Sequence, residues 1–260
     1  MKIRGRRIVP GRATGSALAS AAPFSFVGGA DPVTGTILDV SPGIAQERLA
    51  GRIFAFPHGK GSTVGSYLIY GLAKRGVGPA AIVNASAEGI VAVGATLADI
   101  PMVDRIDTVG LRTGDRIVVD GDRGTVDMPD VRAVPVVSVV LRNRGRILLV
   151  QRSESVDSFR GLWSVISGHL EGRENPKARA LREVREETGL RRIVFRAEGS
   201  PIYARHDSTM YIVHPFLFDT PSRRVRLDSE NVEHRWIRRE ELDRFETVPR
   251  LKDVIATVLA

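Results

Sequence analysis

The chain has 260 residues, enough for one large domain or two ordinary ones, and its 43% hydrophobic and 26% charged residues are typical of a globular protein with buried cores. It contains no cysteine, which excludes disulfides, thiolate metal sites, cysteine nucleophiles and an iron–sulfur cluster held by the chain itself. The formal net charge of +8 is spread along the chain without a nucleic-acid recognition motif, so it favours a solvated basic surface or phosphorylated small molecules over nucleic acid.

The chain shows no sign of a membrane segment. No apolar run has the length of a transmembrane helix, and the basic start, MKIRGRRIVPGRATG, has only short and broken apolar stretches. We therefore expect a cytoplasmic protein that does not associate with membranes. Aromatic residues make up 6% of the chain, so its cores should be rich in Val, Ile, Leu and Ala.

The first half is predicted to consist of short strands separated by glycine-rich turns. Apolar, β-branched segments bounded by Gly, Pro or Asn predict strands at 35–40, 51–56, 80–85 and 89–97. Segment 63–76 differs, because its apolar residues recur at helical spacing and Gly76 follows as a stop signal. Residues 114–128 have the pattern of a hairpin with its turn near Gly121 and Asp122.

A domain boundary is predicted near residues 128–133, where Pro129 and Asp130 interrupt the strand pattern. We therefore expect two domains, over residues 1–131 and 132–260. In the second, we expect two strands over 134–152 joined at 143–145, a strand over 209–220, and helices over 176–188, 239–245 and 250–260. Pro176 suits the first turn of its helix, and Gly189 suits its C-terminal cap.

The helix predicted over 176–188 carries a cluster of acidic residues. Glu183, Glu186 and Glu187 stand at i, i+3 and i+4, so they share one helix face. Three carboxylates there repel one another unless cations neutralise them, and hard divalent ions such as Mg²⁺ or Mn²⁺ prefer oxygen ligands. A metal so held can orient a water and stabilise charge on a departing phosphate. Arg182 can pair with an acid and fix the helix against its loop. The alternative is a charged surface helix with i,i+4 pairs between glutamates and arginines.

Residues 168–190, GHLEGRENPKARALREVREETGL, match in full the Nudix box: Gly, five residues, Glu, seven residues, Arg-Glu, apolar, any, Glu-Glu, any, Gly, apolar. The fixed positions are occupied by Gly168, Glu174, Arg182, Glu183, Val184, Glu186, Glu187, Gly189 and Leu190. The resemblance to the Nudix family implies an α/β/α sandwich. It also implies Mg²⁺- or Mn²⁺-dependent cleavage of a nucleoside diphosphate linked to another group, or of a related diphosphate.

The resemblance implies a role for each matching residue. The expected metal ligands are Glu174, Glu183, Glu186 and Glu187, and the expected structural supports are Gly168, Arg182 and Gly189. Glu183 and Glu186 are the catalytic candidates. The water is activated by one of the box acids or by an acid outside the box, for which Glu230 and Glu233 are candidates.

Two features separate this chain from other proteins with the Nudix fold. Many members have Pro-Gly-Gly at the start of the box, whereas this chain has Ile166, Ser167 and Gly168. This departure from the family pattern affects the expected substrate pocket more than the expected metal site. Isopentenyl-diphosphate isomerases share the fold but typically use a catalytic cysteine. Since this chain has none, isomerase activity is not expected.

The stretch HGKGSTVGS, residues 58–66, leaves a predicted strand and opens a predicted helix. Gly59 and Gly61 let backbone N–H groups approach an anion, and Lys60 adds positive charge. The stretch is not a P-loop, because Lys60 is followed by Gly61 rather than by Ser or Thr. On this pattern alone, a plain strand-to-helix turn remains the alternative.

Four blocks of the first half, SFVGGADPVTGTILDV, GRIFAFPHGKGSTVGSYLIYGL, GPAAIVN and IVAVGATLADIPMVD, together resemble the aconitase-X small-subunit family, which includes the small subunit of archaeal phosphomevalonate dehydratase. The likeness covers roughly residues 1–130. It implies a fold class of α/β (α+β), with a swivelling β/β/α aconitase-type domain followed by the Nudix sandwich. It also implies that Ser62 is the proton acceptor and that Gly59, Lys60 and Gly61 bind the substrate.

A serine is a poor base in water, so it needs a charged, donor-rich loop to lower the cost of its alkoxide. In the family, a large subunit carries the 4Fe-4S cluster that withdraws the hydroxyl, and the absence of cysteine here agrees with a cluster on a partner. Asn84, Glu88 and Asp104 also fall in the family-like blocks, where turn formation or surface charge is the more ordinary role for each.

Together the two resemblances predict a fusion of two enzymes. The first would be a dehydratase small subunit that forms a heterodimer with its large subunit. It would convert (R)-5-phosphomevalonate to trans-anhydromevalonate 5-phosphate in isoprenoid biosynthesis by the mevalonate pathway. The second would be a Nudix hydrolase. The alternatives are a dehydratase subunit for another hydroxy acid, such as a hydroxyproline, and a Nudix-fold regulatory protein that senses a nucleotide.

Overall fold

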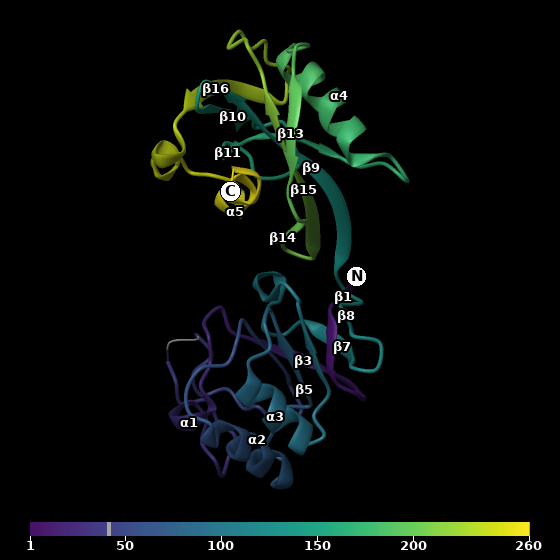
Figure 1. Ribbon diagram of the computed structural model, residues 1–260, viewed down its shortest axis with the longest axis vertical. Coiled ribbons are helices and arrows are strands. Elements are labelled where there is room, and N and C mark those ends of the chain that lie inside the picture. Colours follow the sequence, from purple (N-terminus) through teal and green to yellow (C-terminus); the bar gives the residue numbers. More distant parts are fainter. Residues whose placement is uncertain (41–42, 260) are drawn as a thin grey trace. The chain divides into compact units, whose positions relative to one another are not determined.

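The computed structural model describes residues 1–40 and 43–259 and consists of two compact units, Met1–Arg132 and Ala133–Ala260 (Figure 1). We call them unit 1 and unit 2. Each has its own eight-stranded sheet and its own helices, so the predicted α/β (α+β) fold class is confirmed. Among the described residues, every helix is too short or too polar to cross a membrane.

The sheet of unit 1 has the order β1-β8-β7-β3-β4-β5-β6-β2. Its strands are β1 (Lys2–Arg4), β2 (Arg6–Val9), β3 (Arg12–Ala19), β4 (Ile53–Phe56), β5 (Ala81–Asn84), β6 (Met102–Asp104), β7 (Arg116–Asp120) and β8 (Thr125–Asp127). Its helices are α1 (Phe26–Gly29), α2 (Val64–Lys74), α3 (Gly89–Leu97) and the 3₁₀ turn η1 (Thr108–Gly110). Strands β3 to β6 run parallel, and the remaining pairs are antiparallel.

The core of unit 1 is built around the parallel strands. All four residues of β4 and of β5 are buried, as expected of parallel strands covered on both faces. Four phenylalanine rings, Phe24, Phe26, Phe54 and Phe56, form its centre. Phe24 meets Phe54 edge to face with ring centroids 5.0 Å apart. Each buried ring contributes roughly 1.5–3 kcal/mol from the transfer of apolar surface out of water.

The strand predicted at 89–97 is wrong, because these residues form helix α3. The carboxylate of Glu88 caps the helix by accepting hydrogen bonds from the backbone N–H of Ile90 at 3.0 Å. Gly94 lies against α2, where a Cβ would stand 2.7 Å from Cδ1 of Ile69. The apolar run that resembled a buried strand is therefore a helix whose small residues allow close packing on α2.

The strand predicted at 35–40 is also wrong. This segment forms two isolated bridges, Ala30 to Ile37 and Thr36 to Arg48, rather than a strand. The side chain of Asp31 accepts hydrogen bonds from the backbone N–H groups of Val33 and Thr34 and closes a local turn. The strands predicted at 51–56 and 80–85 are confirmed, as are the helix at 63–76 and the hairpin at 114–128.

A buried carboxylate joins strands β2 and β6. The side chain of Asp104 is 1% exposed and accepts hydrogen bonds from Nε and Nη2 of Arg6 at 2.9 and 2.7 Å and from the backbone N–H of Ala87 at 2.9 Å. Burial by itself raises the pKa of Asp104, but these hydrogen bonds and the charge of Arg6 outweigh it, so the pKa lies below its ordinary value.

The lowered pKa of Asp104 makes the stability of unit 1 depend on pH. The stabilisation is present above the unfolded pKa of about 3.9 and is lost as the pH falls through the lower folded value. Asp104→Asn should remove this contribution. We expect the melting temperatures of the wild-type protein and the variant to differ most near neutral pH and to converge as the pH falls below the unfolded pKa of about 3.9. A difference that stays constant over that range would contradict the assignment.

The sheet of unit 2 has the order β11-β10-β9-β15-β13, with β12 on β9, β14 on β15 and β16 on β10. Its strands are β9 (Arg132–Asn143), β10 (Arg146–Arg152), β11 (Trp163–Ser164), β12 (Ile166–His169), β13 (Val194–Glu198), β14 (Ile202–His206), β15 (Thr209–Asp219) and β16 (Asn231–Ile237). Its helices are α4 (Pro176–Thr188), α5 (Leu251–Leu259) and the 3₁₀ helix η2 (Arg239–Arg244).

Strand β9 shows how the two helices cover opposite faces of this sheet. Val136 and Val140 belong to the apolar cluster that includes α5, whereas Val137 and Val139 belong to the cluster that includes α4. This alternation follows from the two-residue period of a strand. Unit 2 is therefore an α/β/α sandwich, with α4 and α5 as its outer layers (Figure 1).

Most elements predicted for the second half are confirmed. The paired strands over 134–152 meet at Asn143 and Arg146, and strand 209–220 and helix 176–188 are present as β15 and α4. Segment 239–245 forms a 3₁₀ helix rather than an α-helix. Helix α5 confirms the last prediction up to Leu259, while Ala260 lies outside the described residues.

Candidate active sites of the two units

Helix α4 begins and ends as its sequence indicates. Oδ1 of Asn175 accepts a hydrogen bond from the backbone N–H of Ala178 at 3.1 Å, and Pro176 stands in the first turn. Gly189 ends the helix in the left-handed conformation with φ of 68°. The helix buries Val184 on the sheet, and its acidic face is turned toward β12.

Gly168 and Glu183 are in direct contact. A Cβ on Gly168 would lie 2.0 Å from Oε1 of Glu183, so any larger residue here would displace the carboxylate of Glu183. The glycine of the box therefore lets α4 bring the carboxylate of Glu183 against the backbone of β12. Gly168 stays a predicted structural support, and this contact gives the prediction a physical reason.

Glu187 is buried and held by two donors. Its Oε1 accepts a hydrogen bond from the backbone N–H of Ser167 at 3.2 Å, and its Oε2 accepts one from Nδ2 of Asn231 at 2.8 Å. Burial raises the pKa of Glu187 well above its ordinary value. The hydrogen bond from Asn231 opposes this shift, and the negative charge of Glu183 adds to it. Sequence reasoning missed Asn231, which lies 44 residues away and carries no motif.

Two arginines neutralise the rest of the acidic set. Arg179 forms ion pairs with Glu174 and Glu183, and Arg182 forms one with Glu174. Burial raises the pKa of Glu183 in spite of Arg179, and the charges of Glu186 and other acids raise it further. The predicted pairing of Arg182 is present. Arg179 was missed, although its i,i+4 spacing to Glu183 was a usable signal.

The acids fit a divalent cation by their chemistry. Over the described residues, no three carboxylate or imidazole side chains already stand together as a complete metal-binding group. Oε2 of Glu174 is nevertheless buried without a hydrogen-bond donor, and Oε1 of Glu183 is buried against Nε of Arg179, whose charge compensates both acids. With the exposed Glu186 and with Glu187 on the same helix, they offer the all-oxygen donor set that Mg²⁺ or Mn²⁺ takes.

The two acids considered outside the box lie in different places. Glu230 lines the same cavity as Glu183, and its charge contributes to the raised pKa of Glu183. Glu233 forms an ion pair with Nη2 of Arg235 at 2.7 Å on β16 and is not among the residues that line the cavity. Glu230 is therefore the candidate that the fold brings to the site.

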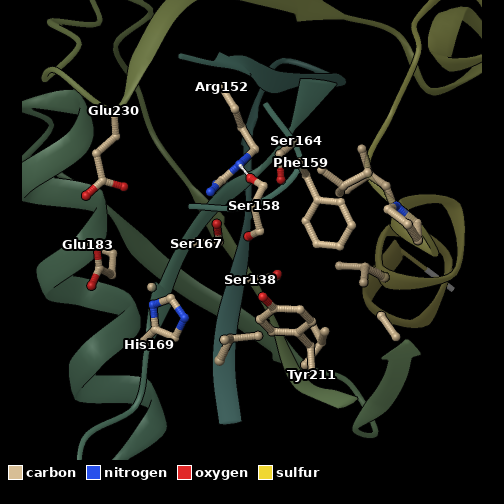
Figure 2. Close-up of a pocket in the computed structure, with 18 of the residues that line it drawn as sticks. Ser138, Arg152, Ser158, Phe159, Ser164, Ser167, His169, Glu183, Tyr211 and Glu230 are labelled. Atoms are coloured by element: carbon tan, nitrogen blue, oxygen red, sulfur yellow. Dashed lines mark hydrogen bonds between the residues drawn. The ribbon is translucent and has the colours of Figure 1, made fainter. Parts of the chain in front are cut away.

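A cavity of about 150 Å³ opens beside Glu183 in unit 2 (Figure 2). Figure 2 shows Glu183, Glu230 and His169 toward one side and Phe159 and Tyr211 toward the other. Ser138, Ser164 and Ser167 contribute hydroxyl groups from β9, β11 and β12. A substrate held here would lie against both the acidic helix α4 and the aromatic pair.

In unit 1, backbone hydrogen bonds to Phe24 hold the predicted anion-binding loop. The backbone N–H of Lys60 donates to the carbonyl of Phe24 at 3.0 Å, and the N–H of Phe24 donates to the carbonyl of His58 at 3.1 Å. Gly59 is buried, and a Cβ there would lie 2.5 Å from Cγ2 of Val91. Gly61 has φ of 110°, and a Cβ would meet the hydroxyl of Ser25 at 2.6 Å.

Ser62 lies exposed at the start of α2. Its Oγ accepts a weak hydrogen bond from the backbone N–H of Val64 at 3.4 Å. Lys60 is exposed on the same loop. The four predicted residues of this site, 59–62, lie in the loop that leads into α2, where the helix dipole favours negative charge.

Asn84, Glu88 and Asp104 have structural roles beside this loop. Nδ2 of Asn84 donates to the carbonyl of Phe56 at 2.8 Å and ties the ends of β4 and β5. Glu88 caps α3, and Asp104 joins β2 to the N–H of Ala87. All three residues therefore have structural roles, but Asn84 and Asp104 are buried hydrogen-bonding groups rather than turn formers or surface charges.

Comparison with known proteins gives a separate match for each half. Residues 2–128 match the family model described as the aconitase X swivel domain, and residues 131–258 match that of the NUDIX domain. The phosphomevalonate dehydratase small subunit of Thermococcus sibiricus is 52% identical over 130 residues, covering 50% of this chain and 100% of that protein. The protein of that name from Pyrococcus furiosus is 54% identical over 128 residues, covering 49% and 96%.

Each of the two solved structures below is similar to about half of the chain. Aconitase X of Thermococcus kodakaraensis in its holo-form is 49% identical with a TM-score of 0.48, covering 49% of this chain and 98% of that chain. The MutT protein of Methanosarcina mazei Go1 is 27% identical with a TM-score of 0.43, covering 48% and 92%.

Proposed function

Since this chain belongs to the aconitase X swivel family through residues 2–128 and carries a Nudix domain over residues 131–258, we propose that it fuses two enzymes. Residues 1–131 act as the small subunit of a phosphomevalonate dehydratase-type hydro-lyase. Residues 132–260 act as a metal-dependent Nudix diphosphate hydrolase. The observation that carries the first assignment is an identity of 52% over the full length of a curated small subunit.

The proposed dehydratase reaction removes water from (R)-5-phosphomevalonate and gives trans-anhydromevalonate 5-phosphate. Ser62 takes the proton from the carbon next to the carboxylate, and the hydroxyl group leaves as water after protonation. The exposed Ser62 needs a partner to enclose it, because it lies on the surface of unit 1. Lys60 and the N–H groups at the start of α2 stabilise negative charge on the serine oxygen and the substrate. A 4Fe-4S cluster on the large subunit supplies Lewis acidity at the leaving hydroxyl.

The proposed hydrolase reaction breaks a P–O–P bond with water. Glu174, Glu183, Glu186 and Glu187 hold Mg²⁺ or Mn²⁺, which stabilises charge on the phosphate when bound. Glu183 and Glu186 act in catalysis, and Glu230 faces the same cavity as a further acid. The observation that supports this assignment is the burial of Glu183 and Glu187 against β12, made possible by Gly168. A sensor without turnover would not need this intact acidic set.

Copurification tests the dehydratase assignment. The tagged chain, expressed under anaerobic conditions in its source organism, should bring down a brown, cysteine-containing large subunit in a one-to-one heterodimer. The complex should eliminate water from 5-phosphomevalonate. Faster turnover of a hydroxyproline would assign the domain to a dehydratase for another hydroxy acid, and recovery of the chain without any iron-containing partner would contradict the proposal.

A further inference from the structure

Helix α4 carries an arginine that the metal chemistry of its acids does not require. Arg179 stands among the seven variable positions of the box, between Glu174 and Arg182. Its Nε contacts Oε1 of Glu183, and its Nη1 lies 3.9 Å from Oε2 of Glu174. One guanidinium therefore reaches two of the four proposed metal ligands.

Glu183 depends on this arginine for the compensation of its charge. Its side chain is buried and lies against the backbone of Gly168. Glu186 and Glu230 add negative charge around it, and Figure 2 shows Glu183 and Glu230 on the same side of the cavity. Among the described residues, Arg179 is the cation that pairs with Glu183. A buried carboxylate is costly without an opposite charge beside it, so Arg179 stabilises this one.

The neighbouring Arg182 has a different place. It pairs with Oε1 of Glu174, and its side chain is 47% exposed, whereas that of Arg179 is 17% exposed. Oε2 of Glu174 accepts no hydrogen bond and faces Arg179 instead. The inner arginine, Arg179, is therefore the one that links both acids.

A guanidinium and a divalent cation exclude each other at these oxygens. Mg²⁺ binds carboxylate oxygens at about 2.1 Å, so it needs the space beside Oε1 of Glu183 that Nε of Arg179 occupies. Arginine keeps its positive charge and has no acceptor atom, so it repels the cation and cannot become its ligand. Arg179 also lines the cavity, which gives the guanidinium accessible space to move into.

We propose that Arg179 competes with the divalent cation of unit 2. Its guanidinium neutralises Glu183 and Glu174 when no cation is bound, and cation binding displaces it toward the cavity. The ion pairs thus stabilise the metal-free protein and raise the concentration of free Mg²⁺ or Mn²⁺ that the site needs. This inference rests on the metal site of the proposed hydrolase.

Arg179→Gln tests the competition, because it removes the charge and keeps a polar side chain. Titration calorimetry of the full chain with Mn²⁺ should give a Kd at least about tenfold below the wild-type value, since one repelling charge is gone. Without metal, the melting temperature of unit 2 should fall by about 4 °C or more, because Glu183 loses its cation. Both tryptophans of the chain, Trp163 and Trp236, lie in unit 2, so their fluorescence reports its melting.

The two changes together distinguish competition from support. An arginine that only held the acids in position would, when removed, lower the melting temperature and also weaken Mn²⁺ binding. Competition predicts a lower melting temperature without metal and tighter Mn²⁺ binding. Saturating Mn²⁺ should therefore reduce the difference in melting temperature between the wild-type protein and Arg179→Gln.

Arg185→Gln is the matched control, because it removes the same charge from an exposed position on α4 outside the cavity. Its Kd for Mn²⁺ should stay near the wild-type value. Arg179→Lys keeps the charge on a shorter side chain, and its Kd should lie between those of the wild-type protein and Arg179→Gln. Combined with Glu183→Gln, Arg179→Gln should give no gain in affinity, which locates the effect at this carboxylate.

The outcomes separate the competition from the hydrolase itself. A folded Arg179→Gln with a Kd equal to or above the wild-type value would overturn the competition, and phosphate release by the wild-type protein would still support the hydrolase. If Arg179→Gln does not fold, a Kd of Arg179→Lys that is not below the wild-type value overturns it. An equal gain in Arg185→Gln would also overturn it, as would the absence of Mn²⁺ binding in every variant. Tighter binding by Arg179→Gln in a chain that cleaves no diphosphate would support the competition and contradict the hydrolase.

Discussion

Glu186→Gln is expected to lower the rate of phosphate release by unit 2 at least about a hundredfold, while the melting temperature stays the same. Glu186 is exposed on α4, so replacing its carboxylate by an amide of the same shape should not disturb packing. The change removes one negative charge from the proposed metal ligands. The measurement is release of inorganic phosphate at saturating Mg²⁺.

The matched control for this variant is Glu240→Gln, which removes an exposed carboxylate from η2 in the same unit. It should retain the wild-type rate. Unchanged phosphate release by Glu186→Gln would show that the acidic face of α4 does not hold the catalytic metal. A matching loss in both variants would point to a general effect of charge rather than to this site.

Ser62→Ala is expected to reduce dehydration by the assembled complex by about 10²- to 10⁴-fold, the usual contribution of a general base. The substitution removes one oxygen from an exposed side chain, and with it a weak hydrogen bond of 3.4 Å from the backbone N–H of Val64. Binding of the large subunit should therefore be unaffected, and kcat rather than the amount of complex should change. The loss is measured as formation of the unsaturated product.

Thr63→Ala, on the next residue, is the control for Ser62→Ala. Its side chain is exposed and makes no capping hydrogen bond to α2, so the variant should dehydrate at close to the wild-type rate. A Ser62→Ala complex that keeps full activity would remove Ser62 from the mechanism. Loss of the large subunit from that complex would instead make it a docking residue.

The fold was predictable wherever local patterns and packing agree. Helix α4 has its cap at Asn175, proline in the first turn and Gly189 at its end, and all three signals point to the same boundaries. Segment 89–97 lacked such agreement, because its apolar and β-branched residues suit a buried strand as well as a helix. The cap from Glu88 and the packing of Gly94 on α2 stabilise this segment as a helix. The packing of Gly94 on α2 cannot be predicted from the local sequence.

The residues of the candidate sites were likewise predictable where they lie close together in the sequence. The acids of α4 follow from the spacing of a single helix, and the loop 59–62 follows from its glycines. Apart from Arg179 on α4 itself, the residues that were missed come from distant parts of the chain: Asn231 binds Glu187, and Phe159 and Tyr211 line the cavity. Only folding brings β14, β15 and α5 to the cavity beside Glu183, so the lining of this cavity could not be predicted from spacing alone.

We propose that this one chain carries two independent catalytic sites. The most direct test measures dehydration and phosphate release on the same preparations of the complex, made with wild-type, Ser62→Ala and Glu186→Gln chains. We predict that Ser62→Ala loses only dehydration and that Glu186→Gln loses only phosphate release. Loss of both activities in either variant, or of neither, would contradict the claim.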